Sequence, residues 1–484
     1  MEMRRRLSGI ALVVAVAALA CSAQYSEEDA LDENGESLAA PKAYTPGCKP
    51  LGGPSYALHG MLLLPAGPKD GYVVVKDERI SLVTAVRNDV PAGVTVVETG
   101  GVISPGLIDL HNHVAYNFIP FWDSGKRWQN RYQWAKASAY TTAVKNPYNA
   151  VKGANNLCEA VKYGEYRALV GGTTTIQGSV DLSCTRSWVR NVEYMNFCSD
   201  HIRQDVLPIG ALTQADADGL NAQFASGQTK AFFVHLAEGV DDSSRAEFDK
   251  LRTLGLLKPQ VVGIHSTALT PAQLTEMGQA GMKIVWSPLS NLALYGKTTD
   301  IPHALAAGIK VSIAPDWSPS GSANVLGELK VADRVNREQF GSLISDADLW
   351  RMTTENPAFI AGMDDKLGKL QPGYFADLMV VRGDVTHPYR AVIDAKPADV
   401  LLTAVSGQAF YGAPALVSAI GDARSYVTVD ACGELRSLAA TETQLALPLG
   451  TETLTDVTAT FTKDGVTSII PLHQCQGAPE SAFH

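Results

Sequence analysis

The sequence predicts an α/β protein in which a (β/α)8 TIM-like barrel is inserted into a composite β-domain. From Gly106 to about Gly362, short apolar runs alternate with stretches of helical periodicity, which is typical of successive βα units. Eight of these runs are strand candidates, and eight parallel strands close a barrel. On both sides the pattern changes to short β-branched runs and turns, so we expect the two flanks to form one β-domain.

The candidate barrel strands are apolar runs of the length that buried strands have. They are Leu107–His113, Thr173–Gln177, Val189–Tyr194, Val206–Leu212, Ala231–Leu236, Val261–His265, Lys283–Ser287 and Lys310–Pro315. Between the first and second candidates, the apolar spacing predicts a helix over Asn155–Leu169.

The flanking β-domain is expected to begin near Tyr56 and to resume after the barrel at Leu367. Its strand-like runs are Gly71–Lys76, Arg79–Val83 and Val94–Val97 before the barrel, and Ser425–Val429, Val457–Phe461 and Ser468–Ile470 in the tail. We therefore expect five segments. They are an export signal at 1–21, an acidic flexible tether at 22–54, the first half of the β-domain at 55–104, the barrel at 105–365, and the second half with a β extension at 366–484.

The first residues predict export from the cytoplasm. A basic start is followed by the apolar run Ile10–Ala20, which is too short to span a bilayer comfortably. The run ends in Ala18–Cys21, which resembles a bacterial lipobox, with cleavage before Cys21 and lipid attached to its thiol. A plain signal peptidase site, for instance after Ala23, is the alternative. We expect a periplasmic or outer-membrane lipoprotein of a bacterium, or a secreted soluble protein if Cys21 is not modified.

Export places the remaining cysteines in an oxidising compartment where disulfides persist. Their even number suggests pairing, although buried free thiols are an equal alternative. Cys184 with Cys198 and Cys432 with Cys475 lie close enough in sequence to pair. The six cysteines are Cys48, Cys158, Cys184, Cys198, Cys432 and Cys475.

The composition favours a small-molecule substrate. With 46% hydrophobic and 19% charged residues, the 484-residue chain has an ordinary globular composition. Its formal net charge of −10 argues against nucleic acid, because phosphate binding needs clustered lysine and arginine. A membrane is expected as a partner only through lipid on Cys21, and a homo-oligomer stays open.

His111 and His113 stand at the end of the first candidate strand. Residues i and i+2 of a strand point to the same side, so both imidazoles can reach one metal ion. In a barrel, the carboxyl ends of the strands carry the active site. A His-x-His pair also occurs by chance, so the interpretation depends on what the later strands carry.

Four polar residues occupy the corresponding ends of later candidate strands, namely His235, Glu238, His265 and Asp316. One histidine in such a place is usually a satisfied structural residue, and Asp316 could merely cap the next helix. Their shared placement on several strands argues against that explanation. The pattern therefore predicts a metal-dependent site.

With these residues the sequence resembles the amidohydrolase superfamily, a metal-containing barrel carried by a β-sandwich-like domain. The resemblance spans about Tyr56 to Gly412. Its marks are Gly106–His113, Gly171–Thr175, Ser287–Asn291, Glu355–Ala358 and Leu367–Leu378. The resemblance implies a hydrolase whose activity depends on a divalent ion.

The resemblance also implies one ion rather than two. Two-metal members carry a bridging carboxylated lysine on the fourth strand, whereas Val206–Leu212 contains none and Lys230 precedes the fifth strand. The step from His235 to Glu238 is similar to mononuclear members of the deaminase, chlorohydrolase and imidazolonepropionase-like subgroup. By this analogy Zn²⁺, or Fe²⁺ as the alternative, is bound by His111, His113, His235 and Asp316.

The same analogy assigns three catalytic roles. Asp316 would take the first proton from water, and Glu238 would deliver protons to the ring nitrogen or leaving group. His265 would orient water or polarise the substrate.

Substrate contacts are predicted from residues near these strand ends. The rings of Trp286 and Trp317 could stack on a planar substrate, and Arg190 and Glu193 could bind its polar groups, although core packing and a surface ion pair are the alternatives. Asn291 belongs to a turn that resembles one near the pocket in the family, and it could bind substrate or be mainly structural. Three further tryptophans, Trp122, Trp128 and Trp134, could also stack on the substrate or serve a loop or core role, and they lie in the first loop, Tyr116–Tyr148.

Three hypotheses follow. The first is an exported hydrolase of a non-peptide C–N bond, acting by deamination or ring opening of an aminated heterocycle, cyclic amide or amidine, and Glu238 favours it. The second is an exported dipeptidase or other amide or ester hydrolase. The third is a non-catalytic surface lipoprotein that keeps the barrel as a binding scaffold.

Overall fold

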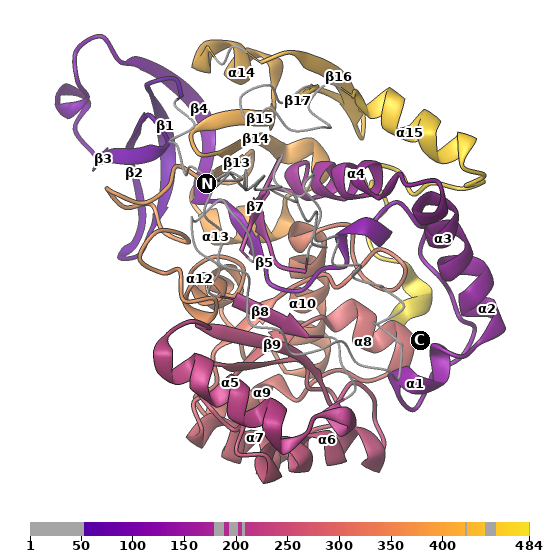
Figure 1. The fold of residues 1–484 in the computed structure, drawn as a ribbon. Coiled ribbons are helices and arrows are strands. Elements are labelled where there is room, and N and C mark those ends of the chain that lie inside the picture. Colours follow the sequence, from indigo (N-terminus) through magenta and orange to yellow (C-terminus); the bar gives the residue numbers. More distant parts are fainter. Residues whose placement is uncertain are drawn as a thin grey trace, which may run out of the picture.

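The computed structural model describes residues 53–178, 188–192, 202–205, 209–421, 424–440 and 452–483. Within these ranges the strands form sheets of nine, five and three strands (Figure 1). The predicted export signal, the lipidation site Cys21 and nearly all of the tether lie outside the described residues. No helix in the described part is long and apolar enough to cross a membrane.

The nine-stranded sheet is built from chain on both sides of the parallel strands, in the order β16-β17-β15-β14-β13-β4-β1-β2-β3. β13 pairs antiparallel with β4, with Leu378 opposite Pro105 and Val381 opposite Val102. The sheet thus joins the two flanks, as the turn-rich flanks predicted. Its strands are β1 (Tyr56–Leu64), β2 (Gly67–Lys76), β3 (Arg79–Thr84), β4 (Thr95–Pro105), β13 (Leu378–Val381), β14 (Val400–Val405), β15 (Gln408–Gly412), β16 (Tyr426–Ala431) and β17 (Glu434–Ala439).

The two smaller sheets contain eight strands among the described residues, in the orders β5-β6-β7 and β12-β11-β10-β9-β8, and their pairs are parallel. A parallel bridge between Asn112 and Asp316 joins the segments that follow β5 and β12. The strands are β5 (Leu107–Asp109), β6 (Thr173–Ile176), β7 (Arg190–Asn191), β8 (Ile202–Asp205), β9 (Ala231–Leu236), β10 (Val261–His265), β11 (Lys283–Trp286) and β12 (Val311–Ile313).

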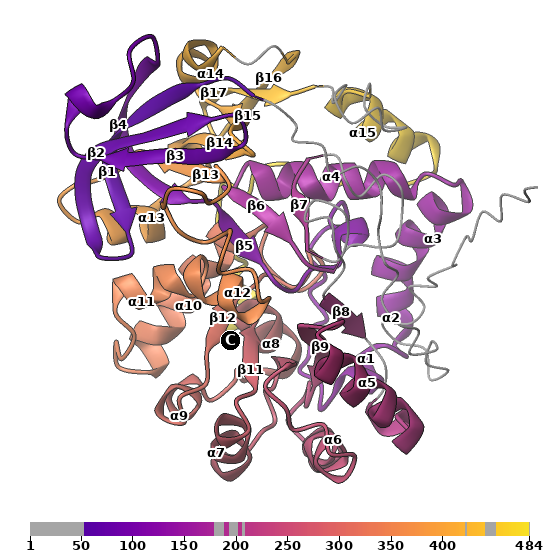
Figure 2. The ribbon, with the colours of Figure 1, turned by 60° about the vertical axis from the view of Figure 1, so that its left-hand side comes forward.

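Helices follow most of these strands, and α6, α7 and α9 lie along the outside of the parallel strands (Figure 2). Reciprocal capping boxes begin α5, with Thr213 and Asp216, and α7, with Thr270 and Gln273. The helices are α1 (Arg131–Trp134), α2 (Ser138–Tyr140), α3 (Asn146–Gly153), α4 (Leu157–Leu169), α5 (Gln214–Ser226), α6 (Asp242–Thr253), α7 (Pro271–Gln279), α8 (Pro288–Tyr295), α9 (Ile301–Ala306), α10 (Val325–Gln339), α11 (Asp346–Arg351), α12 (Glu355–Ile360), α13 (Pro388–Asp394), α14 (Pro414–Ile420) and α15 (Leu454–Lys463).

Side-chain alternation along the strands separates two apolar clusters. On β9, Phe233 packs with Val262 and Val285 in a cluster of strand residues, whereas Phe232 and Val234 pack in the larger cluster shared with the helices. Because successive strand residues point to opposite faces, His235 lies on the same face as Phe233. The His235 side chain therefore points to the side of the sheet that carries Phe233, Val262 and Val285.

The structure corrects the predicted fourth strand. β8 occupies Ile202–Asp205, and the later part of the predicted run Val206–Leu212 contains a 3₁₀ turn over Ile209–Ala211. Proline and glycine inside that run disfavour a central strand, because proline lacks an N–H and glycine has no side chain to pack.

The first strand is also shorter than predicted, since β5 ends at Asp109 and leaves His111 and His113 in the loop that follows. The Asp109 carboxylate explains the ending. Its Oδ1 accepts a hydrogen bond from the His111 backbone N–H at 3.1 Å, and its Oδ2 accepts one from Asn112 Nδ2 at 2.6 Å. These bonds replace strand pairing with a turn.

The tail contains a helix where a strand was predicted. Val457–Phe461 lies within α15, which begins with a capping box of Thr453 and Asp456. Val457 and Phe461 are both buried, and their i, i+4 spacing places them on one helix face. No strand is assigned to Ser468–Ile470.

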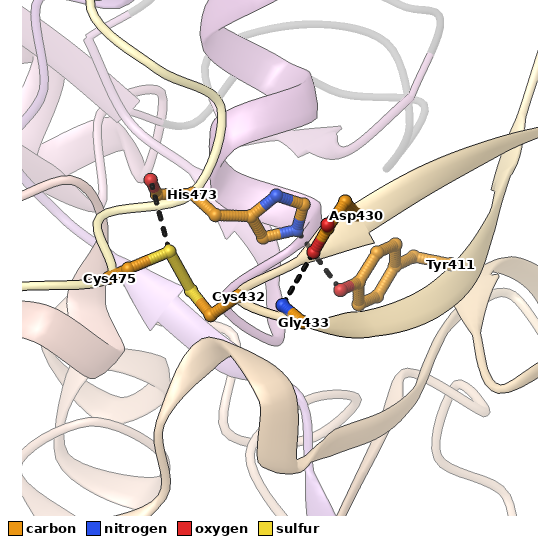
Figure 3. The surroundings of a disulfide bond; sticks show 6 residues. All are labelled: Tyr411, Asp430, Cys432, Gly433, His473 and Cys475. Atoms are coloured by element: carbon orange, nitrogen blue, oxygen red, sulfur yellow. Dashed lines mark hydrogen bonds between the residues drawn. A yellow bond between two sulfur atoms is a disulfide. The ribbon is translucent and has the colours of Figure 1, made fainter.

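The predicted disulfide between Cys432 and Cys475 is present, with a Cα–Cα distance of 5.6 Å. It ties the tail to the turn between β16 and β17, and the nearby ring of His473 lies beside the hydroxyl of Tyr411 at 3.1 Å (Figure 3). Cys158 is also disulfide-bonded. The proposed pair of Cys184 and Cys198 lies outside the described residues.

Candidate metal centre and active site

The loop after β5 is held against the end of β12 by backbone hydrogen bonds. The His113 N–H donates to the Asp316 carbonyl, and the Asp316 N–H donates to the His111 carbonyl, both at 3.1 Å. These bonds bring the His-x-His pair and the aspartate together although they are far apart in sequence. The predicted side-by-side placement is achieved by a bridge between loops rather than by a strand.

His235 and His265 come from the carboxyl ends of the neighbouring parallel strands β9 and β10. His265 and Asp316 both adopt left-handed backbone conformations, with φ of 62° and 69°. Such conformations are uncommon for residues other than glycine and concentrate at functional sites. The strand ends therefore hold these side chains at a cost in backbone strain.

The four histidines and the aspartate at these strand ends form two overlapping groups. Within each group the possible ligand atoms lie within 4.8 Å of one another. One group is His111, His235 and His265, and the other is His111, His113 and Asp316. His111 Nε2 lies 3.0 Å from Asp316 Oδ1, and His113 Nε2 lies 3.5 Å from the same oxygen. His111 is common to both groups and lies at the centre of the cluster.

Two ring nitrogens in this cluster, His235 Nδ1 and His265 Nε2, are buried and lack a hydrogen-bond partner, whereas His111 Nε2 lies beside the Asp316 carboxylate. A buried polar atom without a partner is costly, so such atoms in a folded protein call for an explanation. Imidazole nitrogens around one carboxylate match the ligands that Zn²⁺ and similar ions prefer. The described residues therefore fit a divalent cation.

The protonation states agree with a cation site. Burial and the neighbouring His111 lower the pKa of His113 to about 3, and burial lowers the pKa of His235 and His265 as well. Burial acts to raise the pKa of Asp316, but the adjacent imidazoles outweigh it and lower that pKa. Neutral imidazoles and an ionised carboxylate are the forms that bind metal.

Glu238 and His265 lie beside the cluster, where the sequence predicted catalytic groups. Glu238 is 5% exposed, and its Oε2 is 3.9 Å from His265 Nε2. The same His265 nitrogen is 3.9 Å from Asp316 Oδ2. A small molecule bound between Glu238 and Asp316 could therefore exchange protons with either carboxylate.

Two residues of α8 support this arrangement. Asn291 Oδ1 lies 2.9 Å from His265 Nδ1 and fixes the orientation of that ring. Ser290 Oγ donates to Asp316 Oδ2 at 2.6 Å. Asn291, which was predicted to contact substrate, is fully buried and contacts a catalytic candidate instead.

Of the predicted stacking residues, Trp317 lies at the site and Trp286 does not contact its histidines. The Trp317 ring centroid is 5.3 Å from that of His113 and 5.9 Å from that of Trp134 in the first loop. Trp286 is fully buried, packs against Phe340 and donates its indole N–H to Thr298. The outward face of β11 places Trp286 in the core shared with the helices.

The structure also replaces the substrate prediction for Arg190. Its guanidinium forms a buried ion pair with Asp377 at 2.6 Å and lies over the ring of Phe375. The Asp377 carbonyl accepts the N–H of Gly106, which precedes β5, so the Arg190 side chain reaches the amino ends of the strands, while its backbone pairs with Thr175 inside β6. Glu193 lies outside the described residues.

Sequence reasoning missed several residues that hold the site in place. Arg131 and Tyr295 lie beside Glu238, and Glu247 accepts the Ala237 N–H at 2.7 Å next to it. Trp134 was predicted only as a possible stacking ring, and its hydrogen bond to Tyr295 was not predicted. No local pattern indicates these residues, because each acts through a partner on another element. Asp109 was the exception, since it lies two residues before His111 in a motif already noted.

A family model described as "Amidohydrolase family" matches residues 199–410. Among curated relatives, the 5'-deoxyadenosine deaminase of Methanothermobacter thermautotrophicus is 23% identical over 398 residues, covering 72% of this chain and 90% of the relative. A 5-methylthioadenosine/S-adenosylhomocysteine deaminase of Clostridium tetani is 20% identical and covers 71% of this chain and 87% of the relative.

Solved structures show the same fold. An adenosine deaminase from Xanthomonas campestris with bound zinc matches with a TM-score of 0.60 at 15% identity, over 74% of this chain and 93% of that chain. A guanine deaminase from C. acetobutylicum matches with a TM-score of 0.57 at 16% identity, over 73% and 99% of the two chains. The fold is therefore of the TIM-barrel type with a β-rich domain.

These matches and the strand-end cluster lead to the same class. Residues 199–410 match the amidohydrolase family, and the chain is similar to deaminases and, in fold, to a chlorohydrolase of that superfamily. Within that class it is a hydrolase of carbon–nitrogen bonds other than peptide bonds.

Proposed function

We propose that this enzyme hydrolytically deaminates an aminated heterocycle, with ring opening of a cyclic amide or amidine as the related reaction. The observation that supports it most is the position of Glu238 beside the histidine and aspartate cluster. Relatives named as deaminases of adenosine-type compounds and a similar structure named as a guanine deaminase support an amino-substituted purine as the first substrate class to test.

We propose one divalent ion, Zn²⁺ with Fe²⁺ as the alternative, bound by His111, His113, His235 and Asp316. When bound, such an ion lowers the pKa of a coordinated water to about 7 and makes a nucleophile available at neutral pH. The similar adenosine deaminase structure carries zinc, which supports the choice of metal.

Each proton transfer is assigned to a protein side chain. Asp316 accepts a proton from the attacking water, since the imidazoles beside it keep it ionised. Glu238, protonated at the start, would give the proton on Oε2 to the ring nitrogen and recover one from the hydroxyl that has added to the ring carbon. The proton held by Asp316 would then leave with the departing amine. His265, oriented by Asn291, hydrogen-bonds the attacking group or the substrate.

Two further proposals concern the whole molecule. We propose that the eight parallel strands close into one barrel, which the bridge between Asn112 and Asp316 supports. We also propose that the protein acts outside the cytoplasm, attached through lipid on Cys21, on the strength of its amino-terminal sequence.

A substrate panel with metal analysis tests the proposed reaction. Purified enzyme is assayed for ammonia release from aminated purines, purine nucleosides and triazines, for ring opening of lactams and hydantoins, and for amine release from dipeptides. We expect ammonia release with one tightly bound ion per chain. Turnover of dipeptides alone would contradict the proposed reaction, and two tightly bound ions per chain would contradict the single-ion site.

A further inference from the structure

We propose that Tyr295 and Trp134 are positioning residues that hold one oxygen of Glu238 and leave the other for proton transfer, an inference that rests on the proposed function. The Tyr295 hydroxyl donates to Glu238 Oε1 at 2.6 Å. The Trp134 indole N–H donates to the Tyr295 oxygen at 2.8 Å. Both side chains are at most 4% exposed.

The direction of these hydrogen bonds follows from the groups involved. An indole N–H can only donate, so the Tyr295 oxygen is the acceptor in its contact with Trp134. The hydroxyl has a single hydrogen, which is therefore available for Glu238. A hydrogen bond to a carboxylate is stronger than one between neutral groups, so the donation also fixes the carboxylate's orientation.

The second oxygen of Glu238 faces the cluster. Oε2 lies 3.9 Å from His265 Nε2 and 3.9 Å from the Arg131 guanidinium. Because Tyr295 occupies Oε1, only Oε2 is positioned to exchange a proton with a substrate next to His265. The carboxylate thus has a fixed oxygen and a working oxygen.

The first loop supplies this support through the short helix α1. Arg131 and Trp134 begin and end that helix, and the Arg131 backbone N–H donates to the Glu238 carbonyl at 3.3 Å. Asn130 anchors the loop to the segment after β9, where its Nδ2 donates to Asp241 at 2.6 Å. Glu238 is therefore held between α1 on one side and the end of α8 on the other.

A double-mutant cycle tests the physical link without requiring turnover. Thermal unfolding is measured for the wild type, Tyr295→Phe, Glu238→Leu, which removes the acceptor oxygen, and the variant with both substitutions. If Tyr295 holds the carboxylate, the loss of stability in the double variant is smaller than the sum of the two single losses. Additive losses would show that the hydroxyl does not hold Glu238 and would overturn the inference.

Kinetics then test positioning, using a substrate from the panel. We expect Tyr295→Phe to lower kcat by about 10- to 100-fold with unchanged metal content and a KM within about twofold, because a misplaced proton donor affects the transition state more than binding. Trp134→Phe keeps an aromatic ring but removes the N–H, and we expect a smaller fall in kcat. The variant that carries both Trp134→Phe and Tyr295→Phe should have the same kcat as Tyr295→Phe alone, since Trp134 acts through Tyr295.

Tyr374→Phe is the matched control. The Tyr374 hydroxyl also donates a hydrogen bond, to the Asp364 carbonyl at 2.6 Å, but this residue lies in the core of the nine-stranded sheet. It should keep wild-type kcat. Wild-type kcat in Tyr295→Phe would overturn the positioning role and leave the proposed reaction intact. A wild type inactive on the whole panel would instead contradict the proposed reaction, and the unfolding cycle would still decide whether Tyr295 holds Glu238.

Discussion

Both ends of the parallel strands bury charged side chains, but the two ends satisfy them differently. At the amino ends, Arg190 pairs with Asp377, whose other oxygen accepts the Ser406 N–H at 2.8 Å. At the carboxyl ends, His235 and His265 keep ring nitrogens without hydrogen-bond partners, and both His265 and Asp316 have left-handed backbones. A satisfied buried ion pair indicates a structural joint, whereas buried ring nitrogens without partners on a strained backbone indicate a site for a ligand.

The difference also explains which predicted roles changed. A buried arginine on a barrel strand looks the same in the sequence whether it contacts a substrate or another part of the protein. The partner of the arginine determines its role. Here the partner is Asp377, which belongs to the segment that leads into the nine-stranded sheet. The amino ends of the strands therefore connect the barrel region to that sheet, and the carboxyl ends remain for chemistry.

The largest expected effect is that of His235→Ala at the carboxyl ends. Removing one of the clustered imidazoles should abolish tight metal binding and lower activity by at least about 10³-fold, because the nucleophile depends on the bound ion. Metal content by elemental analysis and ammonia release check this. Full metal content with wild-type activity would mean that the carboxyl-end cluster is not the site.

Glu238→Gln should separate metal binding from catalysis. The amide keeps the shape of the side chain but cannot transfer a proton, so kcat should fall by about 10²- to 10⁴-fold while metal content stays at the wild-type level. Steady-state kinetics and metal analysis of the same preparation give both values. Equal activity in this variant and the wild type would contradict the assignment of Glu238.

Arg190→Leu tests the amino ends. The substitution leaves the Asp377 carboxylate buried without its cation, so the free energy of unfolding should fall by about 3–5 kcal/mol. Denaturant unfolding measures the loss, and the folded fraction should bind metal as the wild type does. A variant of normal stability that has lost substrate binding would restore the original substrate prediction for Arg190.

The smallest expected effect is on the pH dependence of stability and concerns Glu165. This buried carboxyl has one oxygen without a hydrogen-bond partner but lies outside the histidine cluster. Its Oε2 accepts the Trp188 N–H at 3.0 Å, its Oε1 has no partner, and burial raises its pKa to about 8. Because the folded-state pKa lies above the unfolded value, the folded state binds the proton more tightly. The stability contribution is present below about pH 4.5 and is lost as the pH rises through about 8.

Glu165→Gln should therefore reduce the fall in melting temperature between pH 5 and pH 8 by a few degrees. Thermal unfolding across this range measures the change, with the exposed Glu338→Gln as the control. A parallel pH dependence in wild type and variant would show that the buried Glu165 carboxyl is not responsible.

Much of the architecture could be predicted from local pattern. β9 and β10 occupy the predicted ranges Ala231–Leu236 and Val261–His265, because continuous apolar runs of this length suit strands buried on both faces. α4 lies within the predicted helix Asn155–Leu169. Prediction failed where pairing is short: β7 has two residues and β12 three, so packing rather than pattern sets their limits.

By itself the sequence determined the kinds of side chain at the strand ends and their order along the chain, because strand alternation and turn position are local properties. Only the tertiary structure decided which of these side chains meet. Trp134 and Tyr295 are 161 positions apart, and Tyr295 and Glu238 are 57 apart, yet one pair of hydrogen bonds links all three. Contacts between side chains of different elements leave no periodic signal in the sequence, so the orientation of Glu238 emerged only when α1, α8 and β9 were packed together.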